Sequence, residues 1–233
     1  LSKRDGAKDV LDYVRAGYLP EALLNFIASL GWNDGSEQEI FSRQELIAKF
    51  RLERVQRGGA RFDERRLNWM NGHYIRELPL DELYDRTAGF WPPEAEDASD
   101  DHKKQVLALV QERLKYLAEL PELTRFFFTD LPVDPGLISG HKQLKKLAKT
   151  ELAAMLEQTR AALADSGFTA QDLTARLNDL LERTGQKPTV LFSLVRIATT
   201  QSPASPGLAD SLAVLGKETS LRRLDAQLTA LAD

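Results

Sequence analysis

The sequence predicts a mainly α-helical protein. Apolar residues recur three and four positions apart along most of the chain, and residues typical of helix starts and helix ends separate these runs. No stretch alternates apolar and polar residues long enough to indicate a sheet, and the chain contains no visible internal repeat. With 233 residues, the chain is long enough for two or three compact domains.

Residues 1–78 are expected to form a bundle of short helices. A buried helix is expected over 20–30, where proline stands at the first turn and glycine follows the end. A capping box over 42–45 predicts the start of a second helix, and a third is expected over 63–71, ending before Gly72. Because the chain starts on a residue other than methionine, we expect it to be a piece of a longer protein.

The next part of the chain is expected to contain one short and one longer helix. The short helix follows Pro79, and an acidic loop over 94–101 separates it from the longer one. The longer helix is expected over 102–119. One face of this helix carries an apolar stripe made of Val106, Val110, Leu114 and Leu117.

The remainder of the chain is expected to form an all-helical domain. The segment 131–136 contains two prolines and a glycine and is the clearest linker in the sequence. One helix is expected over 144–163, and a second begins at the Thr169 cap and ends at Gly185. Three further helices are expected over 188–200, 208–215 and 221–231.

Composition excludes several classes of protein. The absence of cysteine excludes disulfide frameworks and thiolate sites, and a cytoplasmic location fits best. No run of about 18 apolar residues indicates a membrane span. The three histidines lack zinc-site spacing, no phosphate-binding or nucleophile motif occurs, and we expect no metal site. Asp97, Asp100 and Asp101 are better explained as acidic residues near a helix start than as cation ligands.

A basic stretch between Arg43 and Arg76 is the first candidate site. It holds nine basic and four acidic residues, a local charge of +5, within a chain whose net charge is −4. Many of the cations are arginines, which suit bidentate phosphate contacts. A solvated helix face is the alternative explanation. The net charge does not argue against a polyanionic ligand, because five acidic residues between Glu94 and Asp101 contribute −5.

Arg113 is the second candidate. On the helix expected over 102–119, its side chain falls within the apolar stripe, where an arginine is rarely buried without a partner. An internal ion pair with Glu112, Glu119 or Glu122 is the simpler explanation. The alternative is a cation that projects from an apolar wall and contacts the polar edge of a ligand.

Several ordered blocks of sequence resemble bacterial glutamyl-tRNA synthetases of class I. Ser2-Lys3-Arg4-Asp5-Gly6-Ala7 resembles the glutamyl form of the KMSKS-type signature, K-[IL]-S-K-R-x-G, without its first lysine. Further matching blocks extend along nearly the whole chain. They are 17–25, 30–32, 39–42, 69–76, 120–130 and 215–224.

The resemblance implies a domain organisation and a chemistry. It implies a helical stem-contact domain over 1–78 and helical anticodon-binding domains over 79–132 and 133–233. A catalytic domain that precedes the signature would use ATP and Mg²⁺ to form glutamyl adenylate from L-glutamate. Lys3, with Ser2 and Arg4, would then stabilise charge on the ATP phosphates. The chain alone is expected to be inactive, to hold no cofactor and to be a monomer, with no membrane partner.

The resemblance also implies residues that contact tRNA-Glu. Arg76 and, less directly, His73 belong to the block N-G-x-Y-I-R, whose last arginine contacts tRNA. Arg113 corresponds to an arginine that reads the anticodon in enzymes that discriminate against tRNA-Gln. Ser205-Pro206-Gly207 corresponds to a loop that contacts an anticodon base. A non-discriminating enzyme and a non-catalytic tRNA-binding module are the alternatives.

Overall fold

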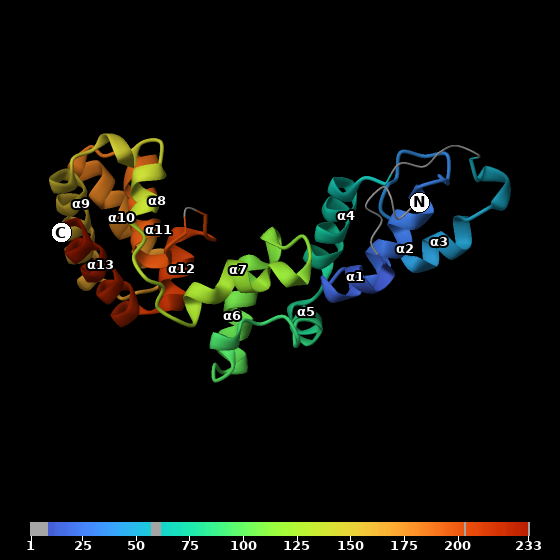
Figure 1. The fold of residues 1–233 in the computed structure, drawn as a ribbon, viewed down its shortest axis with the longest axis horizontal. Helices are drawn as coiled ribbons and strands as arrows, with labels where there is room; N and C mark the ends of the chain where they lie inside the picture. The colour runs from blue at the N-terminus through green and yellow to red at the C-terminus, as the bar shows by residue number, and fades with distance from the viewer. Residues whose placement is uncertain (1–8, 57–61, 203, 233) are drawn as a thin grey trace. The chain divides into compact units, whose positions relative to one another are not determined.

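A computed structural model describes residues 9–56, 62–202 and 204–232, and it is helical, as expected. These residues form thirteen α-helices and several 3₁₀ turns, and no strand occurs among them (Figure 1). The chain divides into two compact units. The first comprises Leu1–Pro92 and Val110–Glu122, and the second comprises Pro93–Leu109 and Leu123–Asp233. None of the described helices is both long enough and apolar enough to cross a membrane.

The two units do not follow the three expected domain ranges. Residues 110–122 belong to the first unit, although the sequence places them within the domain expected over 79–132. Leu114 and Leu117, which are buried, fall within this returning segment. The division into three domains therefore stays a prediction. The compact units of the structure are two, and their boundaries differ from the expected ones.

Several helices of the first unit begin where the sequence predicts a start. The capping box at Ser42 is confirmed, since its Oγ accepts from the Glu45 N–H at 3.1 Å and Glu45 accepts from the Ser42 N–H at 2.7 Å. Pro20 occupies the first turn of its helix. The elements are α1 Val10–Arg15, α2 Pro20–Ser29, α3 Arg43–Lys49, η2 Leu52–Arg54, α4 Glu64–Glu77 and α5 Leu80–Arg86.

The expected end of a helix at Gly72 is wrong. Helix α4 continues through Gly72 to Glu77, and Gly72 itself is buried. A Cβ atom at Gly72 would lie 3.1 Å from the carbonyl oxygen of Leu114, so the glycine allows a second segment to approach the helix closely. Glycine here serves packing and not helix termination.

The single helix expected over 102–119 is also wrong. Helix α6 spans Asp100–Val110, and the 3₁₀ turns η4 Gln111–Arg113 and η5 Leu117–Glu119 follow it before α7 Leu120–Thr124. Leu114, between the two turns, has an extended backbone with ψ of 126°. The four residues of the expected apolar stripe are nevertheless all buried. Burial was predictable from the apolar pattern, but the continuous helix was not.

An aromatic core holds the first unit together. Tyr13 and Tyr18 contact each other edge to face, with ring centroids 5.3 Å apart. Phe26 from α2 and Met70 from α4 join them in the same buried cluster. Helices α2 and α4, which lie side by side, therefore form the platform on which the rest of this unit packs.

The second unit contains the remaining helices. The Thr169 cap and the left-handed Gly185 are confirmed as the ends of α10, with a Gly185 φ of 65°. The single helix expected over 144–163 is wrong, because Leu147 is extended with ψ of 146° and separates η7 from α9. The elements of this unit are η3 Pro93–Ala95, α6, η6 Arg125–Phe127, α8 Pro135–Gly140, η7 Leu144–Lys146, α9 Lys149–Ala164, α10 Ala170–Thr184, α11 Pro188–Thr200, α12 Leu208–Leu215 and α13 Lys217–Ala232.

A buried arginine on α13 connects η6 to the other helices of the second unit through hydrogen bonds. Arg223 on α13 is only 9% exposed and donates to the carbonyl oxygens of Thr199, at 2.6 Å, and Phe126, at 2.7 Å. Its Nε also donates to the carboxylate of Asp130 at 2.9 Å. Hydrogen bonds from Arg222, and then from Arg223, hold the pKa of Asp130 below its usual value.

Candidate nucleic-acid interface

Four cations of the basic stretch have internal partners, and two of these partners are carboxylates. The Lys49 ammonium donates to Asp34 at 2.9 Å, and Arg66 pairs with Glu39 at 3.2 Å. Arg51 and Arg54 donate to backbone carbonyl oxygens. These four cations stabilise the first unit, and they are less available to a ligand than the local charge of +5 suggests.

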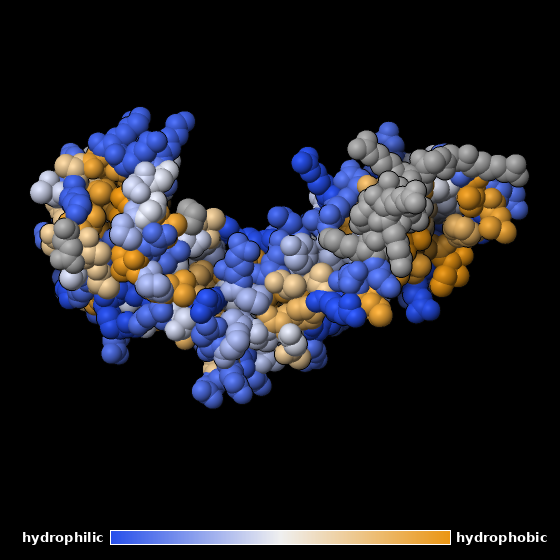
Figure 2. Space-filling view, viewed as in Figure 1, coloured by the Kyte–Doolittle hydropathy of each residue, from blue (hydrophilic) through white to orange (hydrophobic). Residues whose placement is uncertain are grey.

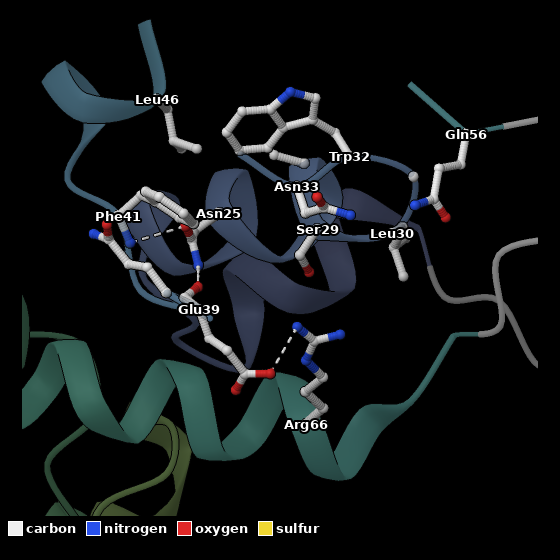
Figure 3. A pocket seen from close by; sticks show the side chains of 13 residues that line it. Asn25, Ser29, Leu30, Trp32, Asn33, Glu39, Phe41, Leu46, Gln56 and Arg66 are labelled. Atoms are coloured by element: carbon white, nitrogen blue, oxygen red, sulfur yellow. Dashed lines mark hydrogen bonds and ion pairs between the residues drawn. The ribbon is translucent and has the colours of Figure 1, made fainter. Parts of the chain in front are cut away.

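Arg66 and its partner Glu39 both line a small pocket beside α2. Figure 3 shows Arg66 of α4 pointing toward Glu39, beside the buried amide of Asn25. Asn25 donates to the Glu39 carbonyl oxygen at 2.8 Å and accepts from the Phe41 N–H at 3.1 Å, which holds this segment against α2. The pocket has a volume of about 230 Å³. Its polar groups mostly fix the position of the segment that carries Glu39.

Three arginines of the basic stretch have no acceptor for their guanidinium within the described ranges. They are Arg43, Arg65 and Arg76. Arg57 and Arg61, the remaining two cations of the stretch, lie outside the described residues. Two of the three unpaired arginines, Arg65 and Arg76, line one pocket, so the available charge is concentrated at one place on α4.

Arg113 lines the same pocket and is exposed. The pocket has a volume of about 390 Å³ and lies between α4 and the turn that follows η4. Its lining residues are Arg65, Asn68, Trp69, Gly72, Arg76, Glu112, Arg113, Leu114 and Lys115. The expected position of Arg113 inside the apolar stripe is therefore wrong, because the helix ends at Val110 and the turn redirects the side chain.

The expected internal ion pair of Arg113 does not form among the described residues. The carboxylate of Glu119 instead accepts from the Lys115 N–H at 2.7 Å, and the Lys115 ammonium lies 3.8 Å from the same carboxylate. Arg113 thus joins Arg65 and Arg76 as a cation without an internal counter-ion in the part of the chain that the structure covers. The sequence could not show that these three arginines lie together, because α4 and η4 are about forty residues apart in the chain.

Two amide side chains hold the turn that carries Arg113 against α4. At the start of the turn, Gln111 donates to the carbonyl oxygens of Ile75 and Leu78, each at 2.9 Å. After it, the fully buried Asn71 donates to the carbonyl oxygen of Lys115. The backbone around Arg113 is therefore held in place on both sides. The sequence did not reveal either amide, although an Asn-Gly pair within a helical pattern was a detectable signal.

His73 does not share this pocket. Its ring is half-buried and contacts Tyr74 edge to face at 6.2 Å between centroids. The Tyr74 hydroxyl donates to the Phe41 carbonyl oxygen at 2.6 Å. Of the two residues expected from the N-G-x-Y-I-R block, the structure brings only Arg76 next to Arg113.

The 205–207 loop lies in the second unit, ahead of α12, and offers less than expected. Ser205 is 2% exposed, and its hydroxyl accepts from Arg196 Nε at 2.9 Å. Arg196 also donates to the Pro206 carbonyl oxygen at 3.4 Å. A direct contact from the Ser205 hydroxyl to a base is therefore not available in this arrangement, whereas Gly207 is exposed. Serine supports the loop from inside, which residue type alone could not show.

Two other expectations concern bound groups. Ser2, Lys3 and Arg4 lie outside the described residues. Among the residues that are described, no three His, Cys, Asp or Glu side chains gather as a metal site. The pocket between α4 and η4 offers positive charge and hydrogen-bond donors, which is the chemistry of anion recognition.

Comparison with known proteins finds matches to tRNA synthetases and to an anticodon-binding domain along the entire chain. The family described as "Anticodon binding domain" matches residues 80–228, and the family described as "tRNA synthetases class I (E and Q), catalytic domain" matches residues 1–69. Glutamate–tRNA ligase from Dehalococcoides mccartyi is 36% identical over 240 residues, which cover 100% of this chain and 49% of that protein. Glutamate–tRNA ligase from Roseiflexus castenholzii is 39% identical over 242 residues, with 100% and 46% covered.

A solved structure agrees with these sequence relatives. The crystal structure of a glutamate tRNA ligase from Elizabethkingia meningosepticum, in complex with its amino acid, matches with a TM-score of 0.81 and 25% identity. The match covers 99% of this chain and 48% of that one. The chain thus spans about half the length of the relatives it matches. Because these matches extend over its whole length, the chain belongs to the glutamate–tRNA ligase family of class I tRNA synthetases.

Proposed function

We propose that the chain is the tRNA-recognising part of a glutamate–tRNA ligase. In the full-length enzyme, L-glutamate would react with ATP to give glutamyl adenylate and pyrophosphate, and the glutamyl group would then pass to tRNA-Glu with release of AMP. ATP and Mg²⁺ belong to this full-length enzyme, where Lys3 would neutralise charge on the phosphates. The chain alone would bind tRNA and make no adenylate.

The observation that carries this proposal is the meeting of Arg65, Arg76 and Arg113 in one pocket without internal counter-ions among the described residues. Arginine suits this role because its planar group donates to phosphate oxygens or to the acceptor edge of a base, and cannot accept. Arg65 and Arg76 would contact phosphates without reading sequence. Arg113, fixed by Gln111 and Asn71, would read a base.

Charging specificity tests the role of Arg113. We expect Arg113→Gln, made in the full-length enzyme, to lower the ratio of tRNA-Glu to tRNA-Gln glutamylation by about ten-fold or more. The physical reason is that glutamine presents both a donor and an acceptor, so a base edge with donors is no longer rejected. The measurement is kcat/KM for both purified tRNAs.

The matched control is Arg43→Gln, which removes an exposed arginine outside the pocket. The control should leave the ratio unchanged. A wild-type enzyme that charges both tRNAs equally would identify a non-discriminating ligase. An unchanged ratio in Arg113→Gln would show that Arg113 does not read the anticodon.

A further inference from the structure

Trp69 is an exposed residue in the lining of the pocket that also holds Arg65, Arg76 and Arg113. It lies on α4, 48% of its surface is accessible, and it lines the pocket together with the unpaired arginines. Arg65, one helical turn earlier, and Gly72, nearly one turn later, lie on the same side of the helix. An indole left accessible at this level is unusual for a residue type that normally contributes much buried area.

The surroundings of Trp69 favour a planar, negatively charged ligand. The lining contains four cationic side chains and one carboxylate. The cations are Arg65, Arg76, Arg113 and Lys115, and the carboxylate is Glu112. Leu114, the other large apolar residue of the lining, is fully buried. An aliphatic ligand would therefore contact one aromatic ring and be surrounded by charged groups. A nucleotide would stack its base on the ring and place its phosphate beside the cations.

We propose that Trp69 is a stacking platform for an unpaired base of the bound tRNA, with Arg65 contacting a phosphate beside it. This inference rests on the proposed function and adds a residue that the basic pattern did not identify. Unpaired RNA bases stack on aromatic rings. Asn68, which lines the same pocket, accepts a hydrogen bond from the hydroxyl of Tyr18. The platform would contribute affinity without contributing charge.

Because the indole is uncharged, replacing Trp69 should change the affinity for tRNA without changing its dependence on salt. We expect Trp69→Leu to weaken binding of a tRNA-Glu transcript to the chain about ten-fold, while the dependence of binding on salt stays that of the wild type. Trp69→Phe keeps an aromatic ring and should stay within about three-fold of the wild type. Binding is measured by fluorescence anisotropy of end-labelled transcript at several salt concentrations.

Ile47→Ala is the matched control, because Ile47 is 70% exposed and lies outside the pocket. It should bind as the wild type does. If Trp69→Leu also binds as tightly as the wild type, the stacking proposal is wrong, while salt-dependent binding by the wild type would still support the proposed function. If the wild type binds no tRNA, the proposed function itself fails. Thermal melts of all variants, expected to agree, identify any loss of folding.

Discussion

Asn71 joins three segments of the first unit through one buried amide. It accepts from the Leu19 N–H at 2.8 Å and donates to the Lys115 carbonyl oxygen, and no part of it is exposed. Burial without these partners would be unfavourable, so the amide is strongly constrained. A single uncharged residue thereby links the start of α2 to the turn beside Arg113.

Removing that amide tests its structural role. We expect Asn71→Ala to lower the free energy of unfolding of the first unit by about 2 kcal/mol, because the buried Leu19 N–H and the partly buried Lys115 carbonyl oxygen lose their partner. The measurement is urea unfolding followed by tryptophan fluorescence, since all three tryptophans lie in the first unit. Gln44→Ala, at an exposed position of α3, should change the free energy by less than about 0.5 kcal/mol. Equal stability of the two variants would contradict the account.

At the scale of elements, the sequence predicted helices where the determinants are local. The Ser42 capping box and the Gly185 terminus act within one turn, so they were visible in the sequence. The break after Val110 was not visible, because Gln111 donates to the carbonyl oxygens of Ile75 in α4 and of Leu78 just after it, which lie far away in the sequence. The same long-range contacts decide the exposure of Arg113. The residue types of the candidate site were therefore predictable, but their grouping was not.

Gly17 at the end of α1 offers a test of that long-range packing. Its φ is 75°, and a Cβ there would lie 2.5 Å from Leu117 Cβ and 2.8 Å from a ring carbon of Phe90. We expect Gly17→Ala to destabilise the first unit by about 3 kcal/mol, through the left-handed backbone and through overpacking. The same fluorescence-detected unfolding measures the change.

Gly89→Ala is the matched control, because a Cβ at Gly89 meets no described atom within 4 Å. It should change the free energy of unfolding by less than about 1 kcal/mol in either direction. If the two variants were equally stable, the returning segment with Leu117 would not pack against α1 as described.

At the scale of the whole molecule, net charge is a poor guide to the ligand. The chain carries −4 overall, yet Arg65, Arg76 and Arg113, which have no counter-ion among the described residues, line one pocket. Acidic residues elsewhere in the sequence offset these three charges in the sum. An acidic protein can therefore present a local polyanion site. The proposed function requires that this pocket bind tRNA phosphates.

The most direct test is the salt dependence of tRNA-Glu binding by the wild-type chain and by Arg76→Gln. Counter-ion release predicts that the logarithm of the association constant falls linearly with the logarithm of salt concentration. Loss of one phosphate contact should reduce this slope by about 1 in Arg76→Gln. Lys49→Gln, which removes a cation already paired with Asp34, should keep the wild-type slope. A flat response in the wild type, or an Arg76→Gln slope equal to that of Lys49→Gln, would show that this pocket does not bind tRNA phosphates.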